Sequence, residues 1–421
     1  MNLAVISVCA LALAVLVSCV SRLNVGVLAV ALAWIVGVYI GGMPVNTVMA
    51  GFPGPLFLTL AGVTLLFALA ETNGTLERIA HHAVRICRGN CGAIPVMFFV
   101  LGAALSSMGP GNIATAALLA PLAMATAARN GIPLFLMAIM VGNGANSGGL
   151  SPFAPTGIIV NGIMARNGLP GYELPTYLYN LSAHALVAFA GYALFGGLRL
   201  FRSSAGAGPA ASGQGSAEIT PDVQAQAFAR RHWITMGVIA TLILVVIVAK
   251  ANVGMAAFAG AVILVLTGSA DDVEAVKRMP WRVIVMVCGV TVLISLVERA
   301  EGIDLLVSLV ARIASADTVT GVVAFLTGIV SVYSSTSGVV LPAFLPMVPG
   351  LASTLQGASP LAIAMSMNVG GHLVDVSPLS TIGALCLAGT TAGDSRALFN
   401  KLLAWGLSMA VVGAILCYLT F

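Results

Sequence analysis

The chain has 421 residues, of which 59% are hydrophobic and only 8% are charged, and its formal net charge at pH 7 is +4. A soluble domain carries about 25% charged residues, so this composition excludes an ordinary soluble protein and indicates a multi-pass integral protein of the lipid bilayer. The weak net charge gives no support for nucleic-acid binding. The chain also has no GxxxxGK loop, so it shows no sign of ATP-driven transport.

The first half of the chain predicts five membrane crossings and one re-entrant hairpin. A crossing helix needs about 20 apolar residues. Residues 75–89 place apolar and basic side chains on different faces, which predicts a helix lying in the membrane interface. Ala93 to Ala128 is interrupted by Ser106 to Asn112, and each arm, at about 15 residues, is short for a crossing, so we expect a hairpin. The expected crossings are Leu3 to Val20, Leu23 to Ile40, Gly54 to Ala70, Pro133 to Met164 and Leu178 to Leu198.

Residues 202–231 predict a flexible linker, because they are rich in Ser, Gly and Ala and contain no apolar run. The second half then repeats the pattern of the first. We expect an amphipathic helix at Ile303 to Ile313 and a second hairpin at Val319 to Leu351, broken at Ser334 to Gly338. The expected crossings are Trp233 to Ala249, Val253 to Leu266, Trp281 to Val297, residues 359–389 and Leu398 to Leu419.

The two halves share sequence landmarks at a nearly constant offset, which indicates an internal repeat. Ser151-Pro152 matches Ser377-Pro378 at 226 residues (377 − 151), and Gly62-Val63-Thr64 matches Gly289-Val290-Thr291 at 227 (289 − 62). Five crossings in each half turn the second half over in the membrane, so the repeats, residues 1–201 and 232–421, should be inverted.

Charge placement predicts the orientation, because Lys and Arg are enriched in cytoplasmic loops. The topology puts four basic residues on one side and the remaining fourteen of eighteen (18 − 4) on the other. The side with fourteen should be cytoplasmic, as expected for a bacterial inner membrane. The linker is then cytoplasmic and both termini are extracytoplasmic. The four outside residues are Arg166, Lys250, Arg299 and Arg312.

Two hydrophobic segments are interrupted by residues that cannot stay helical, Val141 to Gly162 and Met367 to Gly389. Free backbone groups at membrane depth are tolerated only inside protein or beside a cavity. A matched pair of such breaks in two halves points to a transporter binding site. We therefore expect the first break to meet the hairpin tip around Asn112, and the second to meet the tip around Thr336.

Several motifs resemble the ion transporter superfamily. Gly109 to Ala125 is similar to the hairpin tip of divalent-anion:sodium symporters, although only Asn112 of the Ser-Asn-Thr signature is present. Ser334 to Pro346 also departs from that signature, which argues against a two-sodium mechanism. The break VDVSPLSTIGAL resembles MatC-type malonate and dicarboxylate carriers. The resemblance implies an all-α fold of two inverted repeats with hairpins and broken helices at the midplane, a homodimer, and an elevator-type motion.

The tips and breaks contain hydroxyl and amide side chains but no Lys or Arg. Helix N-termini are therefore the available source of positive potential for an anion, and freed carbonyls suit Na⁺. The alternative is that these side chains only cap broken helices or permit close packing. The candidate substrate- and ion-binding residues are Asn112, Thr115, Asn143, Asn146, Ser147, Ser151, Thr156, Ser335, Thr336, Ser337, Asn368, Asp375, Ser377 and Thr381.

Asp375 and His372 are the only ionisable residues in the breaks. Charge within a membrane is costly and is by default a functional hypothesis, so either residue is a candidate for proton or ion coupling. The alternative for Asp375 is a carboxylate that caps backbone amides. His184 is interpreted as a polar packing residue. Glu71 and Glu298, at the ends of crossings, are interpreted as interfacial anchors.

Together these features predict a secondary transporter, not an enzyme, for a small carboxylate anion of the malonate or succinate class. Transport should be coupled to Na⁺ or H⁺, with no cofactor and no metal site beyond the coupling ion. The alternatives are a cation/proton antiporter and an arsenite-type oxyanion permease of the same superfamily. The absence of a nucleophile–base set or a Cys/His metal spacing argues against a membrane enzyme.

Overall fold

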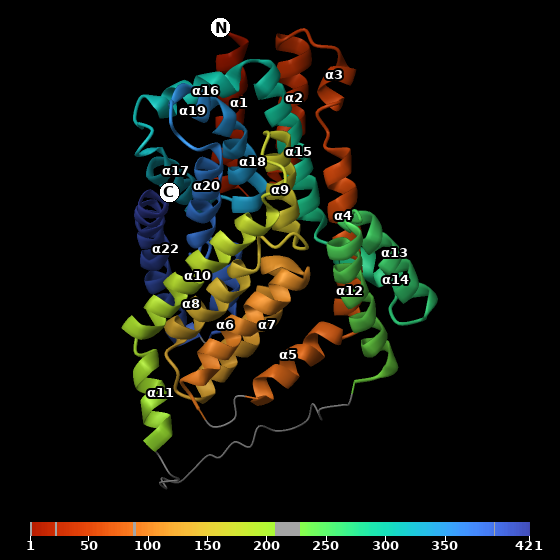
Figure 1. Cartoon of the computed structure of the whole chain (residues 1–421), viewed down its shortest axis with the longest axis vertical. Coiled ribbons are helices and arrows are strands. Elements are labelled where there is room, and N and C mark those ends of the chain that lie inside the picture. Colours follow the sequence, from red (N-terminus) through yellow and green to blue (C-terminus); the bar gives the residue numbers. More distant parts are fainter. Residues whose placement is uncertain (1, 22, 87–89, 207–227, 391) are drawn as a thin grey trace.

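The computed structural model describes residues 2–21, 23–86, 90–206, 228–390 and 392–421. Over these residues the chain is helical and contains no strand (Figure 1). The first half comprises α1 (Leu3–Val20), α2 (Val25–Trp34), η1 (Ile35–Ile40), α3 (Val45–Met49), α4 (Gly54–Thr72), α5 (Thr75–Ile86), α6 (Ala93–Met108), α7 (Gly111–Arg129), α8 (Leu134–Ser147), α9 (Pro155–Arg166), α10 (Glu173–Leu194) and α11 (Gly197–Gly206).

The second half begins after the residues that the structure leaves undescribed. It comprises α12 (Arg230–Ala249), α13 (Val253–Leu266), α14 (Asp272–Arg278), α15 (Trp281–Arg299), α16 (Gly302–Ala311), α17 (Val319–Tyr333), η2 (Thr336–Val340), α18 (Leu341–Phe344), η3 (Leu345–Met347), α19 (Val348–Thr354), α20 (Pro360–Leu373), α21 (Thr381–Ala388) and α22 (Ala392–Thr420).

Apolar composition explains why these segments are helical, and Asn side chains fix where several of them begin. The Asn24 side chain accepts a hydrogen bond from the Gly26 amide at 2.9 Å at the start of α2. Asn252 accepts from the Gly254 amide at 3.0 Å at the start of α13. Such N-caps satisfy amides that have no partner in the first helical turn.

The helices gather into two packed groups. In the first group α2 packs against α15 and α4 packs against α13, with α1 and α16 alongside. In the second group α6 and α10 pack against α8, while α17 and α22 pack against α20. Figure 1 shows α6, α7, α8 and α10 as neighbours within the second group. The hairpin arms and the interrupted helices therefore share one body of the fold.

Six helices in the described residues are long and apolar enough to cross a membrane. They are Gly54–Thr72, Gly111–Arg129, Arg230–Ala249, Trp281–Arg299, Thr336–Thr354 and Ser395–Thr420. Two of these are second arms of the expected hairpins. The prediction that every arm has about 15 residues is therefore wrong for α7, which has 19. The sequence estimate counted the tip residues Gly111 and Asn112 as part of the interruption, whereas the helix begins there.

The expected linker lies mostly at residues 207–227, outside the described residues. Its ends are corrected, because α11 continues to Gly206 and α12 already begins at Arg230. The short helices α3 and α14 were not predicted from the sequence. Each is only five to seven residues long, too short to display a clear helical period.

Candidate transport site

The first interrupted helix leaves its axis after Ser147 and resumes at Pro155. The Gly157 amide reaches back across the break to the Gly149 carbonyl at 3.0 Å. A side chain at position 157 would collide with the Ser151 carbonyl oxygen, and one at Gly383 would collide with the Ser377 carbonyl oxygen. Both breaks therefore need glycine at the same place in their turn.

The first tip joins α6 to α7 and lies against the first break. Gly109 and Gly111 adopt φ angles of 142° and 77°, a region that favours glycine. The Asn112 amide nitrogen donates to Asn146 Oδ1 at 2.9 Å. Thr156 Oγ1 donates to Asn112 Oδ1 at 3.4 Å. The expected meeting between this tip and the first break is therefore present.

The second tip makes the corresponding contact with the second break. Thr336 Oγ1 lies 2.7 Å from Asp375 Oδ1 and 3.3 Å from the Gly371 carbonyl oxygen. The Ser335 hydroxyl accepts from the Gly338 amide at 3.2 Å and shapes the turn. Beyond Asp375, the Ser380 hydroxyl donates to the Asp375 carbonyl and lies 2.7 Å from the Ser377 carbonyl. Hydroxyl groups thus hold the second break on both sides of the carboxylate.

Each break also packs against the hairpin of the other half. α21 packs on α7, and α9 packs on α18 and η3. The Asn167 amide, just after α9, donates to the Leu345 carbonyl at 2.8 Å. A Cβ placed on Gly142 would lie 3.0 Å from Val376 Cγ1, so α8 passes directly beside the second break. The two tip contacts therefore belong to one compact region.

Most predicted site residues are buried in this region. Ser151 Oγ donates to the Ser107 carbonyl at 2.7 Å, and Ser147 Oγ donates to the Gly144 carbonyl at 2.7 Å. Ser335 is partly buried and Thr381 is exposed, so these two lie at the edge. The buried members are Asn112, Thr115, Asn143, Asn146, Ser147, Ser151, Thr156, Thr336, Ser337, Asn368, His372, Asp375 and Ser377.

Some of these buried groups lack a protein partner. Thr115 Oγ1, Asn146 Nδ2 and Asn368 Oδ1 make no hydrogen bond. Buried polar atoms are nearly always paired, so unpaired amide and hydroxyl groups beside two helix breaks are suited to bind a polar ligand. Among the tips and breaks, Asp375 is the only carboxylate and no Lys or Arg is present. α7, α9 and α21 begin here, and their free amides supply the positive potential.

Sequence reasoning did not include two residues of α10 that reach this region. Asn180 Nδ2 donates to the Asn146 carbonyl at 2.9 Å and to the Ser147 carbonyl at 3.2 Å. His184 Nδ1 lies 2.8 Å from Asn143 Oδ1. Asn180 and His184 are four residues apart and therefore share one helix face. Two polar residues at this spacing in an apolar crossing are the signal that could have identified them.

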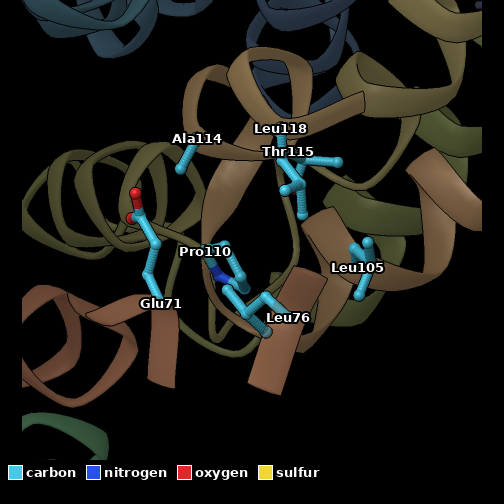
Figure 2. Close-up of a pocket in the computed structure, with 7 residues that line it drawn as sticks. All are labelled: Glu71, Leu76, Leu105, Pro110, Ala114, Thr115 and Leu118. Carbon is cyan, nitrogen blue, oxygen red and sulfur yellow. The ribbon is translucent and has the colours of Figure 1, made fainter. Parts of the chain in front are cut away.

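A small pocket lies beside the first tip (Figure 2). Its polar members are Glu71 and Thr115, and Figure 2 shows Pro110 of the tip between them. Glu71 also lies 4.0 Å from Arg278 Nη1, with both side chains about half exposed. The other lining residues are Leu76, Leu105, Ala114 and Leu118. The pocket therefore joins the end of α4 and the start of α5 to the first hairpin, and it does not extend to the second tip.

Comparison with known proteins adds a family and a fold. The YdaH transporter of Alcanivorax borkumensis, whose crystal structure is described as revealing an unusual topology, is similar with a TM-score of 0.59 and 19% identity. The match covers 89% of this chain and 87% of that one, and at this identity it shows the fold alone. No curated protein matches the chain. Residues 1–149 match the family model for the N-terminus of the dicarboxylate carrier protein MatC, which confirms over that stretch the resemblance to MatC-type carriers.

Proposed function

We propose that this protein is a secondary active transporter, not an enzyme, for a small dicarboxylate anion of the malonate or succinate class. The observation that carries the proposal is the match of residues 1–149 to the MatC dicarboxylate carrier family. The likeness in fold to a solved transporter and the six apolar membrane-length helices support an integral membrane carrier. The buried, unpaired polar groups beside two broken helices support a polar substrate at that place.

The architecture we propose is a pair of inverted repeats, residues 1–201 and 232–421, each with a re-entrant hairpin. Helix positions support the repeat, because α4 and α15 start 227 residues apart (281 − 54) and α8 and α20 start 226 apart (360 − 134). Packing supports it as well, since α2 against α15 corresponds to α13 against α4. An odd number of crossings per repeat gives the inversion.

We further propose a cytoplasmic linker and extracytoplasmic termini, on the ground of the basic residues. A homodimer and an elevator-type shift of the second packed group against the first rest on the family resemblance. The division into two groups of helices is compatible with such a motion, because the tips and breaks all belong to one group. Cysteine accessibility from each side of the membrane would test the orientation.

The anion would be held by amides and hydroxyls at the tips and breaks, with the N-termini of α7, α9 and α21 supplying positive potential. Bound dicarboxylate brings negative charge close to Asp375. Like charges repel in a medium of low dielectric constant, so entry of the substrate would favour a cation that neutralises this carboxylate. Coupling to Na⁺ or H⁺ is therefore part of the proposal, with Asp375 and His372 as the coupling residues.

The proposal is tested with purified protein in proteoliposomes. Uptake of labelled malonate and succinate is measured under an imposed Na⁺ gradient, an imposed pH gradient, both, and neither. We expect saturable uptake that exceeds equilibrium under at least one gradient. Uptake that ignores both gradients would overturn coupled transport. Thermal-shift measurements with a panel of carboxylates, with and without Na⁺, would identify the substrate and the ion independently of flux.

The single carboxylate at the second tip also favours a second candidate, a cation/proton antiporter. Proton release from proteoliposomes on addition of Na⁺ in the absence of any carboxylate would select that function. An oxyanion permease is the third candidate, and it would show flux driven by membrane potential without saturation. Liposomes without protein are the control for all three measurements.

A further inference from the structure

Two buried histidines lie beyond the tip contacts, where the two halves of the chain meet. His184 is on α10 and His372 is near the end of α20, and both side chains are fully buried. α10 packs against α20 and against α8. The two imidazoles are near enough to interact electrostatically. We refer to His184 and His372 as the histidine pair.

Hydrogen bonds determine which nitrogen of each ring carries its proton. Asn143 donates its amide nitrogen to the Ile139 carbonyl at 2.8 Å, so its Oδ1 is the atom that faces His184 Nδ1 at 2.8 Å. His372 Nδ1 lies 2.9 Å from the Asn368 carbonyl oxygen. Both partners are oxygens that only accept, so each Nδ1 must be the donor. In a neutral imidazole the other nitrogen is then a bare acceptor.

Both Nε2 atoms are therefore lone-pair acceptors, and neither has a hydrogen-bond partner. One buried unpaired nitrogen would be an isolated exception to the pairing of buried polar groups. Two unpaired acceptors with the same polarity, on helices that pack together, share a single chemical requirement, which is a hydrogen or a cation. The Na⁺ ion prefers oxygen ligands, whereas imidazole nitrogen at neutral pH readily takes a proton.

The pair has few ionisable neighbours. α8, α17 and η2, which pack around α10 or α20, contain no Asp, Glu, Lys, Arg or His. Asp375, just after α20, is engaged by Thr336 at the second tip. The remaining charged groups lie near the ends of helices that pack against α10 or α20. These are Arg166 on α9, Glu173 on α10, Arg199 and Arg202 on α11, and Asp394, Arg396 and Lys401 on α22.

α10 connects the pair to the first tip through hydrogen bonds. Asn180, one turn before His184, holds the Asn146 and Ser147 carbonyls, and Asn146 in turn accepts from Asn112. His184 also holds Asn143 on the same helix α8. On the other side His372 lies three residues before Asp375 of the second tip. The pair is thus attached to both breaks at once.

We propose that His184 and His372 form a proton-binding site that couples transport to H⁺ by sharing one proton across their Nε2 atoms. This inference rests on the proposed function and names its coupling ion. A buried imidazolium is costly without a countercharge, so the pair remains neutral until a dicarboxylate enters and supplies negative charge. The proton comes from water on one side and returns to water on the other, which leaves both rings neutral.

Nitrogen-15 NMR of histidine-labelled protein in nanodiscs tests the site without any assumption about the substrate. We expect both histidines to show the Nδ1–H tautomer in the neutral form, and the two rings to titrate as one coupled unit. His184→Gln should therefore shift the titration of His372. Independent titration, or the opposite tautomer at either ring, would overturn the proposal, because two bare Nε2 atoms would then not exist.

Transport measurements supply the second test. Substrate-dependent acidification of the lumen, followed with a trapped pH dye, should disappear in His184→Gln and in His372→Gln. Exchange of internal for external substrate should continue, because it needs no net proton movement. His82→Gln on α5 is the matched control, since that ring lies outside the pair and bonds the Arg78 carbonyl. Variants that retain acidification would overturn the proton site.

The two failures can be separated. If the wild-type protein transports no dicarboxylate but the histidines titrate as one unit, the proposed substrate is wrong and the proton site stands. If dicarboxylate uptake is coupled to Na⁺ alone and the histidine variants behave as wild type, the transport function stands and the proton site is wrong. The melting temperature of each variant confirms that the protein remains folded.

Discussion

The Thr336 hydroxyl donates to the Asp375 carboxylate at 2.7 Å and thereby joins the second hairpin tip to the second helix break. In the first half the equivalent connection runs between two amides, Asn112 and Asn146, at 2.9 Å. The two connections have the same place in the fold but differ in charge. Only the second can change its charge when a proton or a cation binds, so the two halves have unequal roles in the proposed transport cycle.

Asp375→Asn is expected to uncouple transport without unfolding the protein. Asparagine has nearly the same shape, and its Oδ1 can still accept from Thr336, but it carries no charge. Accumulation of dicarboxylate against a gradient should be lost, while substrate exchange and the melting temperature are retained. Asp304→Asn on the exposed face of α16 is the matched control. Unchanged accumulation and ion dependence in Asp375→Asn would leave Asp375 as a cap of the break only.

Asn112→Ala is expected to destabilise the first tip contact. The substitution removes the partner of Asn146 Oδ1 and of the Thr156 hydroxyl, and an unsatisfied buried polar group costs about 1–3 kcal/mol. The free energy of unfolding in denaturant should fall by that amount. The exposed Asn130, which bonds the Thr126 carbonyl, provides the control Asn130→Ala, expected to be nearly neutral.

A double-mutant cycle with Asn146→Ala separates the contact from other effects of the two substitutions. Residues in direct contact show coupling energies of about 0.5–3 kcal/mol. Additive effects within about 0.3 kcal/mol would mean that the tip and break are not energetically connected through these two side chains.

Hydrophobicity predicted the positions of the helices well. Leu3–Val20 and Val253–Leu266 were expected at the bounds that the structure has, because in a chain of this composition the ends of apolar runs are marked by Asn, Ser and Gly. The tip-to-break contacts also followed from the paired interruptions. The match works because an interrupted helix exposes backbone groups that must be satisfied inside the protein.

Side-chain partnerships were much less predictable. Asn180 and His184 look like ordinary members of an apolar crossing until α8 and α20 are placed beside them. Thr381 was grouped with the site because of its neighbours in sequence, yet it faces outward at the first position of α21. Which face of a helix meets a neighbour depends on tertiary packing, and a sequence with apolar residues on every face carries little information about it.

Thr115→Val tests whether the pocket beside the first tip takes part in transport. Thr115 is buried, and its hydroxyl makes no hydrogen bond although it lines the pocket (Figure 2). Valine has nearly the same shape, and replacing an unpaired buried hydroxyl should leave the melting temperature unchanged or raise it. Uptake should fall if the hydroxyl contacts the substrate or ion, as we expect. Thr241→Val, at an exposed position of α12, is the control, and normal uptake in Thr115→Val would remove Thr115 from the site.

Gly144→Ala tests whether the interrupted helices need close contact with the hairpins. A Cβ at Gly144 would lie 2.7 Å from the Phe99 Cα of α6, and one at the repeat-related Gly370 would collide with the Ala324 carbonyl of α17. Backbone atoms cannot move aside as a flexible side chain can, so each substitution should cost about 1–3 kcal/mol of overpacking. The free energy of unfolding measures this cost directly.

Gly237→Ala is the matched control for this effect, because a Cβ there meets nothing within 4 Å on α12. Alanine should be neutral at position 237, or stabilise the helix by roughly 0.5–1 kcal/mol through its better helix propensity. Equal effects at positions 144 and 237 would contradict the close crossing of α8 with α6. A loss of transport in Gly144→Ala or Gly370→Ala that exceeds the loss of stability would show that the spacing between hairpin and break is itself required for binding.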